Sequence, residues 1–144
     1  GEEGKAAGYY RKALDPGVEY DEEGRAYAAN NLGSLHADRG NREAAEGRFA
    51  EAKADLALAE RYFLEAVGRN PEYASPRFNL GIVRMSAARM AKLTSGRYDV
   101  RLLRQARSDM ESALALWRGD ARALEILAQC DRLLRLAEEE ERGR

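Results

Sequence analysis

The sequence has few of the residues that favour β-structure, a disulfide framework or a metal site. Val and Ile together number six and Thr occurs once, and this scarcity of β-branched residues argues against strands. The single cysteine, Cys130, cannot form an intrachain disulfide, which leaves the compartment open. The single histidine, His36, lacks companions at the spacing of a metal site or a Ser-His nucleophile, so we interpret it as an ordinary groove or surface residue. No apolar run approaches the roughly 20 residues of a membrane-spanning helix.

The residues that are abundant favour helices. Hydrophobic residues make up 44% of the 144 residues and charged residues 34%, and Ala, Leu, Glu and Arg dominate both groups. All four are good helix formers, and the chain has only three prolines. A chain of this length corresponds to one ordinary domain with a core of its own. We therefore predict an all-α fold, in which Cys130 and Trp117 are packed core side chains.

An apolar pattern recurs along the chain at helical spacing. It has two copies, formed by Ala59, Phe63, Ala66 and Leu80 and by Ala106, Met110, Ala113 and Leu127. In both copies 14 residues separate the last Ala from the Leu. Self-similarity of this kind predicts a helical repeat array, in which each helix pair buries its apolar face on its neighbour.

Turn and capping residues divide the pattern into six expected helices. These cover about residues 2–14, 21–39, 42–68, 75–94, 97–117 and 120–141, with Asp21, Ser75 and Asp120 as N-caps. Grouped as repeats, they form a half repeat (2–14), two long repeats (21–70 and 74–118) and a capping helix (120–141). Because the first segment already corresponds to the second half of a repeat, we expect the chain to be part of a longer protein.

The third expected helix has two interpretations. Ala45, Phe49 and Ala52 continue the apolar phase of the residues that follow, which predicts one long helix over 42–68 that passes through Gly47. The alternative is a break at Gly47, which would give the second and third helices more equal lengths. We favour the long helix because a turn is expected to reset the phase, and one Gly inside a helix costs only about 1 kcal/mol.

The repeated residues resemble the tetratricopeptide repeat (TPR) family. Asn31-Leu32-Gly33 and Asn79-Leu80-Gly81 are similar to its first-helix motif, and the further matches are Gly40 as the turn glycine, Ala45, Phe49, Ala52, Ala59, Phe63, Ala66 and Pro71. The family period is about 34 residues, whereas Leu32 to Leu80 spans 48 and Leu80 to Leu127 spans 47. The resemblance implies a right-handed α-α superhelix, a solenoid of about six antiparallel helices, with hairpins lengthened by ~20 Å of helix per repeat.

The resemblance also implies a binding site, because first helices of the family line a concave groove that holds a peptide or a helix. The positions one turn either side of the Leu-Gly pairs are Tyr27, Asn30, Asn31, Ser34, Ser75, Phe78, Asn79, Ile82, Arg122, Glu125 and Gln129. Asn31 and Asn79 matter most, since an Asn amide can bond both groups of a peptide backbone. The alternative is that both amides bond locally. Only Asn79 and Arg122 match the clamp with which some members bind a terminal carboxylate, so we do not expect that clamp here.

The charges are distributed unevenly, which supplies a rival interpretation. Residues 1–76 carry a net charge of −5, residues 77–107 of +7 and residues 108–144 of −3. Arg97, Arg101 and Arg104 form a stripe of the basic segment that could bind nucleic acid or an acidic partner. The alternative is that acidic neighbouring helices pair with these arginines. The near absence of aromatic residues beside them and the sequence pI of about 6.0 argue against nucleic acid.

The sequence thus predicts a non-catalytic module that binds a protein or peptide, as a scaffold or an assembly adaptor. We find no catalytic constellation, no metal site and no cofactor motif. The alternatives are binding of nucleic acid or an acidic partner through residues 77–107, and a purely structural segment of a larger solenoid. The long third helix could also offer a flank for a homodimer.

Overall fold

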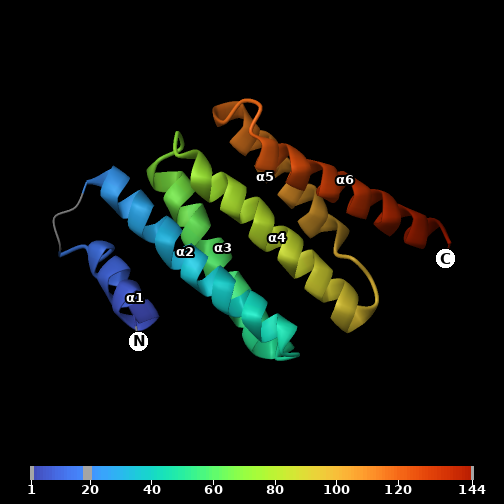
Figure 1. Cartoon of the computed structure of the whole chain (residues 1–144), viewed down its shortest axis with the longest axis horizontal. Helices are drawn as coiled ribbons and strands as arrows, with labels where there is room; N and C mark the ends of the chain where they lie inside the picture. The colour runs from blue at the N-terminus through green and yellow to red at the C-terminus, as the bar shows by residue number, and fades with distance from the viewer. Residues whose placement is uncertain (1, 18–20, 144) are drawn as a thin grey trace. The chain divides into compact units, whose positions relative to one another are not determined.

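The computed structural model describes residues 2–17 and 21–143, and all regular structure within them is α-helical (Figure 1). The helices are α1 (Glu2–Ala13), α2 (Glu22–Ala45), α3 (Phe49–Arg69), α4 (Ala74–Ser95), α5 (Val100–Leu116) and α6 (Ala121–Arg142). They pack mainly on their neighbours in sequence, as α1 does on α2, α2 on α3 and α5 on α6. The predicted all-α class is confirmed.

The chain forms two compact units, Gly1–Pro76 and Arg77–Arg144. Unit 1 contains α1, α2 and α3 together with the first residues of α4. Unit 2 contains the rest of α4 with α5 and α6. Each unit is described by itself.

Three of the helices have an aspartate as N-cap. Asp21, Asp99 and Asp120 each accept a hydrogen bond from the backbone N–H three residues later, at 2.7, 3.1 and 3.0 Å, which satisfies a donor that the first helical turn leaves free. The predicted caps Asp21 and Asp120 are confirmed. The fifth helix begins later than predicted, because Asp99 caps it and Arg97 therefore lies in the preceding loop.

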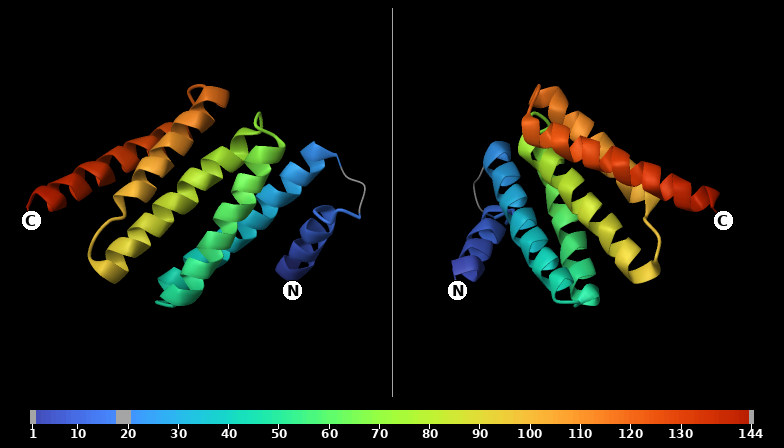
Figure 2. Two further views of the ribbon diagram at one scale, coloured as in Figure 1. Left: turned by 180° about the vertical axis from the view of Figure 1, so that it is seen from behind. Right: turned by 45° about the vertical axis from the view of Figure 1, so that its right-hand side comes forward.

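The core of unit 1 is a close contact between α2 and α3, which lie side by side as an antiparallel hairpin in both views of Figure 2. Gly33 of α2 faces Phe63 of α3 so closely that a Cβ at Gly33 would lie 2.5 Å from Cε1 of the Phe63 ring. Leu32, Ala59 and Phe63 are all fully or almost fully buried here. A side chain at position 33 would therefore hold the two helices apart.

The prediction of one long helix over 42–68 is wrong. Helix α2 continues through Gly40 to Ala45, and the chain turns at Gly47, whose φ of +78° favours glycine. Gly40 is a buried contact residue, since a Cβ there would lie 3.0 Å from Leu56. The apolar phase continues across this turn in sequence, but it does not mark one buried helix face, because Ala45 is exposed and Phe49 only half-buried. Gly40 is accordingly not the turn glycine that the family resemblance implies.

Unit 2 repeats the glycine contact between α4 and α5. A Cβ at Gly81 would lie 2.6 Å from Cε of Met110. A second apolar cluster further along the three helices comprises Met85, Ala88, Leu103, Ala106, Cys130, Leu133, Leu134 and Ala137. The prediction of a packed Cys130 is confirmed, and burial raises the pKa of its thiol to about 11, which keeps the thiol protonated and unreactive at neutral pH.

We expect Gly33→Ala to lower the free energy of unfolding by about 1–3 kcal/mol, because the aromatic ring of Phe63 cannot yield to the new methyl group without moving the helices. Gly81→Ala should cost less, since the flexible end of Met110 can move aside and the backbone oxygen of Ala106, 3.2 Å from the added Cβ, needs to shift only slightly. Gly68→Ala is the matched control: it lies in α3 with open space around it, and Ala is the better helix former by about 1 kcal/mol. Urea unfolding measures all three. Equal effects at positions 33 and 68 would contradict the account.

Candidate functional site

The predicted groove residues of unit 1 have different environments. Tyr27 is exposed, whereas Asn30 is 5% exposed and its amide Nδ2 donates to the Tyr73 hydroxyl at 3.1 Å and to Ser75 Oγ at 3.4 Å. Asn30 therefore links α2 to the segment that begins α4. Helix α4 begins at Ala74, one residue before the predicted N-cap Ser75.

Asn31 and Ser34 are half-buried on α2. The Nδ2 atom of Asn31 is buried and has no hydrogen-bond partner within the described residues. A buried amide donor without a partner is costly.

In unit 2 the structure brings three of the predicted residues together. Phe78 is buried with Ile82 packed against its cluster, and the guanidinium carbon of Arg122 lies 4.8 Å from the centre of the Phe78 ring. Trp117 lies 6.0 Å from Phe78 between ring centres and is 38% exposed. The prediction that Trp117 is a core residue is therefore wrong. Asn79 is half-buried on α4, next to this cluster in sequence.

Trp117 is a surface residue because α5 ends at Leu116 and the indole lies just beyond it. The sequence did carry a signal: Trp117 and Arg122 flank the short turn between α5 and α6, so both had to lie at one end of that hairpin. A cation over one aromatic ring beside a second, half-exposed ring can hold an apolar side chain and a carboxylate of a partner. We call Phe78, Trp117 and Arg122 the aromatic cluster.

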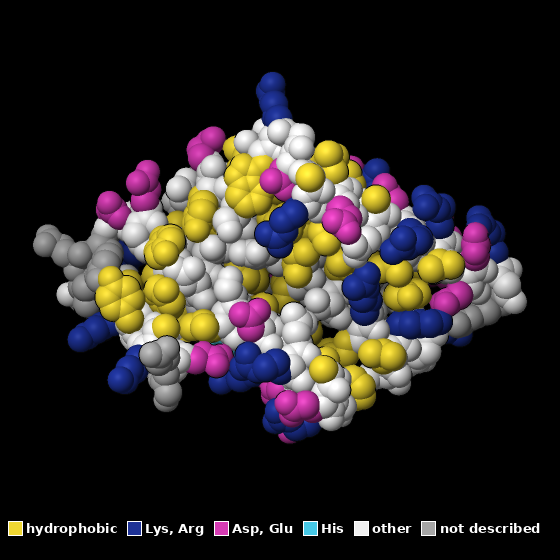
Figure 3. Space-filling model, viewed as in Figure 1, with side chains coloured by type: hydrophobic (Ala, Val, Ile, Leu, Met, Phe, Trp, Pro, Cys, Tyr) yellow, Lys and Arg dark blue, Asp and Glu magenta, His cyan; other side chains and the backbone are white. Residues whose placement is uncertain are grey.

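Much of the charge of residues 77–107 is neutralised inside unit 2. Arg84 pairs with Asp109 at 2.9 Å, Arg107 with Asp131 at 2.6 Å and with Glu111, and Lys92 with Glu140 of α6. On the face shown in Figure 3, the basic side chains over α6 also lie among acidic ones. The alternative of pairing with neighbouring acidic residues therefore holds for this part of the basic segment.

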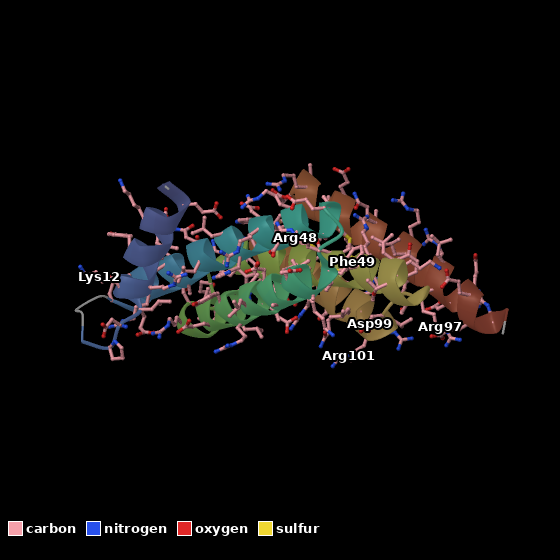
Figure 4. All side chains as sticks on the ribbon, turned by 90° about the horizontal axis from the view of Figure 1, so that it is seen from below. Lys12, Arg48, Phe49, Arg97, Asp99 and Arg101 are labelled. Atoms are coloured by element: carbon pink, nitrogen blue, oxygen red, sulfur yellow. The ribbon has the colours of Figure 1, made fainter. Side chains whose placement is uncertain are left out.

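Arg97, Arg101 and Arg104 are exposed and take part in no ion pair within residues 2–17 and 21–143. Figure 4 shows Arg97 and Arg101 near the start of α5, at the same edge of the unit as Asp99. Arg101 and Arg104 lie on α5, but Arg97 lies in the loop before it, so the three do not form one helical stripe as predicted.

A polar cluster in unit 1, buried except for the half-exposed Arg39, was not predicted from the sequence. His36, Arg39 and Glu43 follow one face of α2, and Asp55 meets them from α3. His36 Nδ1 donates to Asp55 Oδ1 at 3.0 Å, and Arg39 donates to both oxygens of the carboxylate, at 2.9 and 3.0 Å. The ring of His36 stacks on Tyr62, with 5.6 Å between their centres. The expectation of an ordinary groove or surface histidine is wrong.

Glu43 lies in the same cluster, and its Oε1 atom is buried without a hydrogen-bond partner among the described residues when its carboxyl group is taken as ionised. Glu43 is 5% exposed and Asp55 is 7% exposed. The hydrogen bond with Asp55 raises the pKa of Glu43 above its ordinary value of 4.5, and burial acts in the same direction. Burial alone would raise the pKa of Asp55, but hydrogen bonds from Arg39, Glu43 and His36 outweigh it and hold that pKa well below 3.8. We infer that the two carboxyl groups share one proton, which leaves Arg39 and Asp55 as a balanced ion pair.

The signal for this cluster was present on both helices. His36, Arg39 and Glu43 are spaced three and four residues apart, and Asp55 interrupts the apolar face formed by Ala52, Leu56 and Ala59. His36 and Arg39 also line a hollow of about 350 Å³ with Arg11 and Glu3 of α1.

Within the described residues no three His, Cys, Asp or Glu side chains are arranged to hold a metal ion. None of the described helices combines the length and apolar character of a membrane span.

We expect the stability of the wild type to fall as the pH rises above about 4.5, because the proton on Glu43 that stabilises the folded state is lost as the pH passes through its raised pKa. Glu43→Gln retains a donor toward Asp55 that does not titrate, so its free energy of unfolding should not show this decline. Glu51→Gln, an exposed change in α3, is the control and should follow the wild type. Urea unfolding at a series of pH values above 4.5 measures the effect. A parallel decline in Glu43→Gln would contradict the shared proton.

The sequence matches no protein-family model, and we find no match among curated proteins or solved structures. The resemblance to tetratricopeptide repeats therefore rests on the residues quoted from the sequence. Unit 2 thus holds the aromatic cluster and three exposed arginines without an ion pair in the described residues, and unit 1 holds the polar cluster around His36 and Asp55.

Proposed function

We propose that this protein is a non-catalytic module that binds a peptide or a helix of a partner protein. Its two glycine-centred hairpins would stack as a right-handed superhelix of the tetratricopeptide type. The resemblance in sequence supports this arrangement. So does the recurrence of one contact, between Gly33 and Phe63 in unit 1 and between Gly81 and Met110 in unit 2.

The observation that carries the proposal is the aromatic cluster of Phe78, Trp117 and Arg122. Trp and Arg are the residues that most often dominate binding energy at protein interfaces, where they surround a desolvated centre. Trp117 is 38% exposed although it packs against Phe78, so its outer face can still bury apolar area. Arg122 is held over the Phe78 ring at 4.8 Å, which orients its guanidinium group before a partner arrives.

This geometry defines the chemistry of the partner. An apolar side chain would pack on the indole of Trp117, and a nearby carboxylate would accept hydrogen bonds from Arg122. Leu124, in the first turn of α6, is exposed as well and extends the apolar area on that helix.

Selection from a displayed peptide library tests the proposal. We expect the wild type to select peptides that combine an apolar anchor with an acidic residue. Their affinity should fall about tenfold or more in Trp117→Ala, as for the loss of an interface anchor of about 2 kcal/mol, when measured by isothermal titration calorimetry. Leu93→Ala is the matched control, since it removes an exposed apolar side chain of the same unit.

The control variant should bind like the wild type, and circular dichroism should show that both variants retain their helices. If the library gives no binding peptide, or if the selected peptides bind Trp117→Ala as tightly as the wild type, the aromatic cluster is not a partner site.

A further inference from the structure

The start of α5 carries positive charge that the rest of unit 2 does not neutralise. Arg101 and Arg104 line a hollow of about 440 Å³ together with Val100, Gln105, Ser108 and Glu141. Arg97 lines a neighbouring, smaller hollow with Tyr98, Ala137, Glu140 and Glu141. We call Arg97, Arg101 and Arg104 the arginine surface. Glu141 of α6 lines both hollows.

The acidic groups near this surface are too few to balance it. Glu140 is engaged by Lys92, and the carboxylate of Asp99 accepts the hydrogen bond that caps α5. Glu141 remains as the adjoining carboxylate without an ion pair in the described residues. Three arginines against the two carboxylates of Asp99 and Glu141 leave a local excess of about one positive charge, which attracts an acidic partner.

The donors of the surface suit carboxylates. Each guanidinium group can bind one carboxylate through two parallel hydrogen bonds. Arg101 and Arg104 lie three residues apart on α5 and therefore on one face, with the Ser108 hydroxyl and the Gln105 amide in the same hollow. A peptide with two carboxylates one helical turn apart could engage both arginines.

The surface is poorly suited to nucleic acid. Binding of single strands relies on aromatic side chains on which bases stack. Tyr98 is the aromatic residue beside the arginine surface, and it is half-buried with Lys92 5.4 Å from its ring centre. An acidic peptide needs no such platform.

We propose that the arginine surface binds an acidic segment of a partner protein, and that the run Glu138–Glu141 at the end of α6 competes with this segment for the same arginines. The inference is independent of the aromatic cluster, because it concerns other residues and another partner chemistry. The end of α6 acts as a tethered, weak substitute for the partner. Removal of its carboxylate charges should strengthen the attraction of the arginine surface for an acidic partner.

Fluorescence anisotropy with a labelled Glu-rich helical peptide tests this proposal on the full chain at low salt. Arg101→Glu plus Arg104→Glu should weaken binding roughly tenfold, as expected for two lost and reversed charge pairs. Arg132→Glu plus Arg135→Glu is the matched control: it changes the same charge, at the same spacing, on an exposed part of α6. The control should change affinity much less.

Two further variants separate the parts of the proposal. Arg101→Lys plus Arg104→Lys keeps the charge and should weaken binding only partly, because Lys lacks the forked donors. Glu138→Gln plus Glu141→Gln removes the competing charges, leaves the ion pair of Glu140 with Lys92 intact, and should strengthen binding of the peptide several-fold at low salt. Circular dichroism checks that each variant retains its helices.

Equal weakening by the control pair would show attraction by total charge and would overturn the arginine surface as a site. Tighter binding of a single-stranded DNA oligonucleotide than of the peptide, lost with the same arginines, would overturn the acidic partner. Unchanged affinity in Glu138→Gln plus Glu141→Gln would overturn the competition. None of these results depends on Trp117, so they are distinct from a failure of the peptide-binding proposal.

Discussion

The fold of each unit depends on a helix pair whose backbones approach closely at a glycine. In unit 1 the absent side chain of Gly33 makes room for the ring of Phe63, and in unit 2 that of Gly81 makes room for Met110. Large apolar side chains can then fill the seam from one helix only. This one-sided packing buries the seam without a bulky residue on α2 or α4 at the crossing.

The same seam explains why unit 1 can hold a polar cluster. Gly33, His36, Gly40 and Glu43 follow one another along the face of α2 that meets α3, so close glycine contacts alternate with buried polar side chains. The polar groups satisfy one another only in one register, because Asp55 accepts from Arg39 and His36 of α2 together. Packing brings the helices together, and the cluster favours one alignment of the pair.

Local rules were sufficient for part of this structure. The helix formers and the aspartate caps predicted the class and most helix starts, and the Leu-Gly pairs marked the helix contacts. The turn at Gly47 was the less favoured of two interpretations, because the apolar phase of Ala45, Phe49 and Ala52 continues across it. Only the backbone angle of Gly47 and the neighbours of Gly40 distinguish a turn from a helix contact. The His36 cluster was missed because Asp55 lies on another helix, and the exposure of Trp117 depends on where α5 ends.

Because the helices of each unit approach most closely at these glycines, the glycine contacts should be the most stable part of each unit. Amide hydrogen exchange of the native protein tests this claim most directly, since it reports local opening along every helix. The account predicts the slowest exchange around Leu32–Gly33 and Phe63 in unit 1 and around Leu80–Gly81 and Met110 in unit 2. Slower exchange at the helix ends than at these contacts would contradict it.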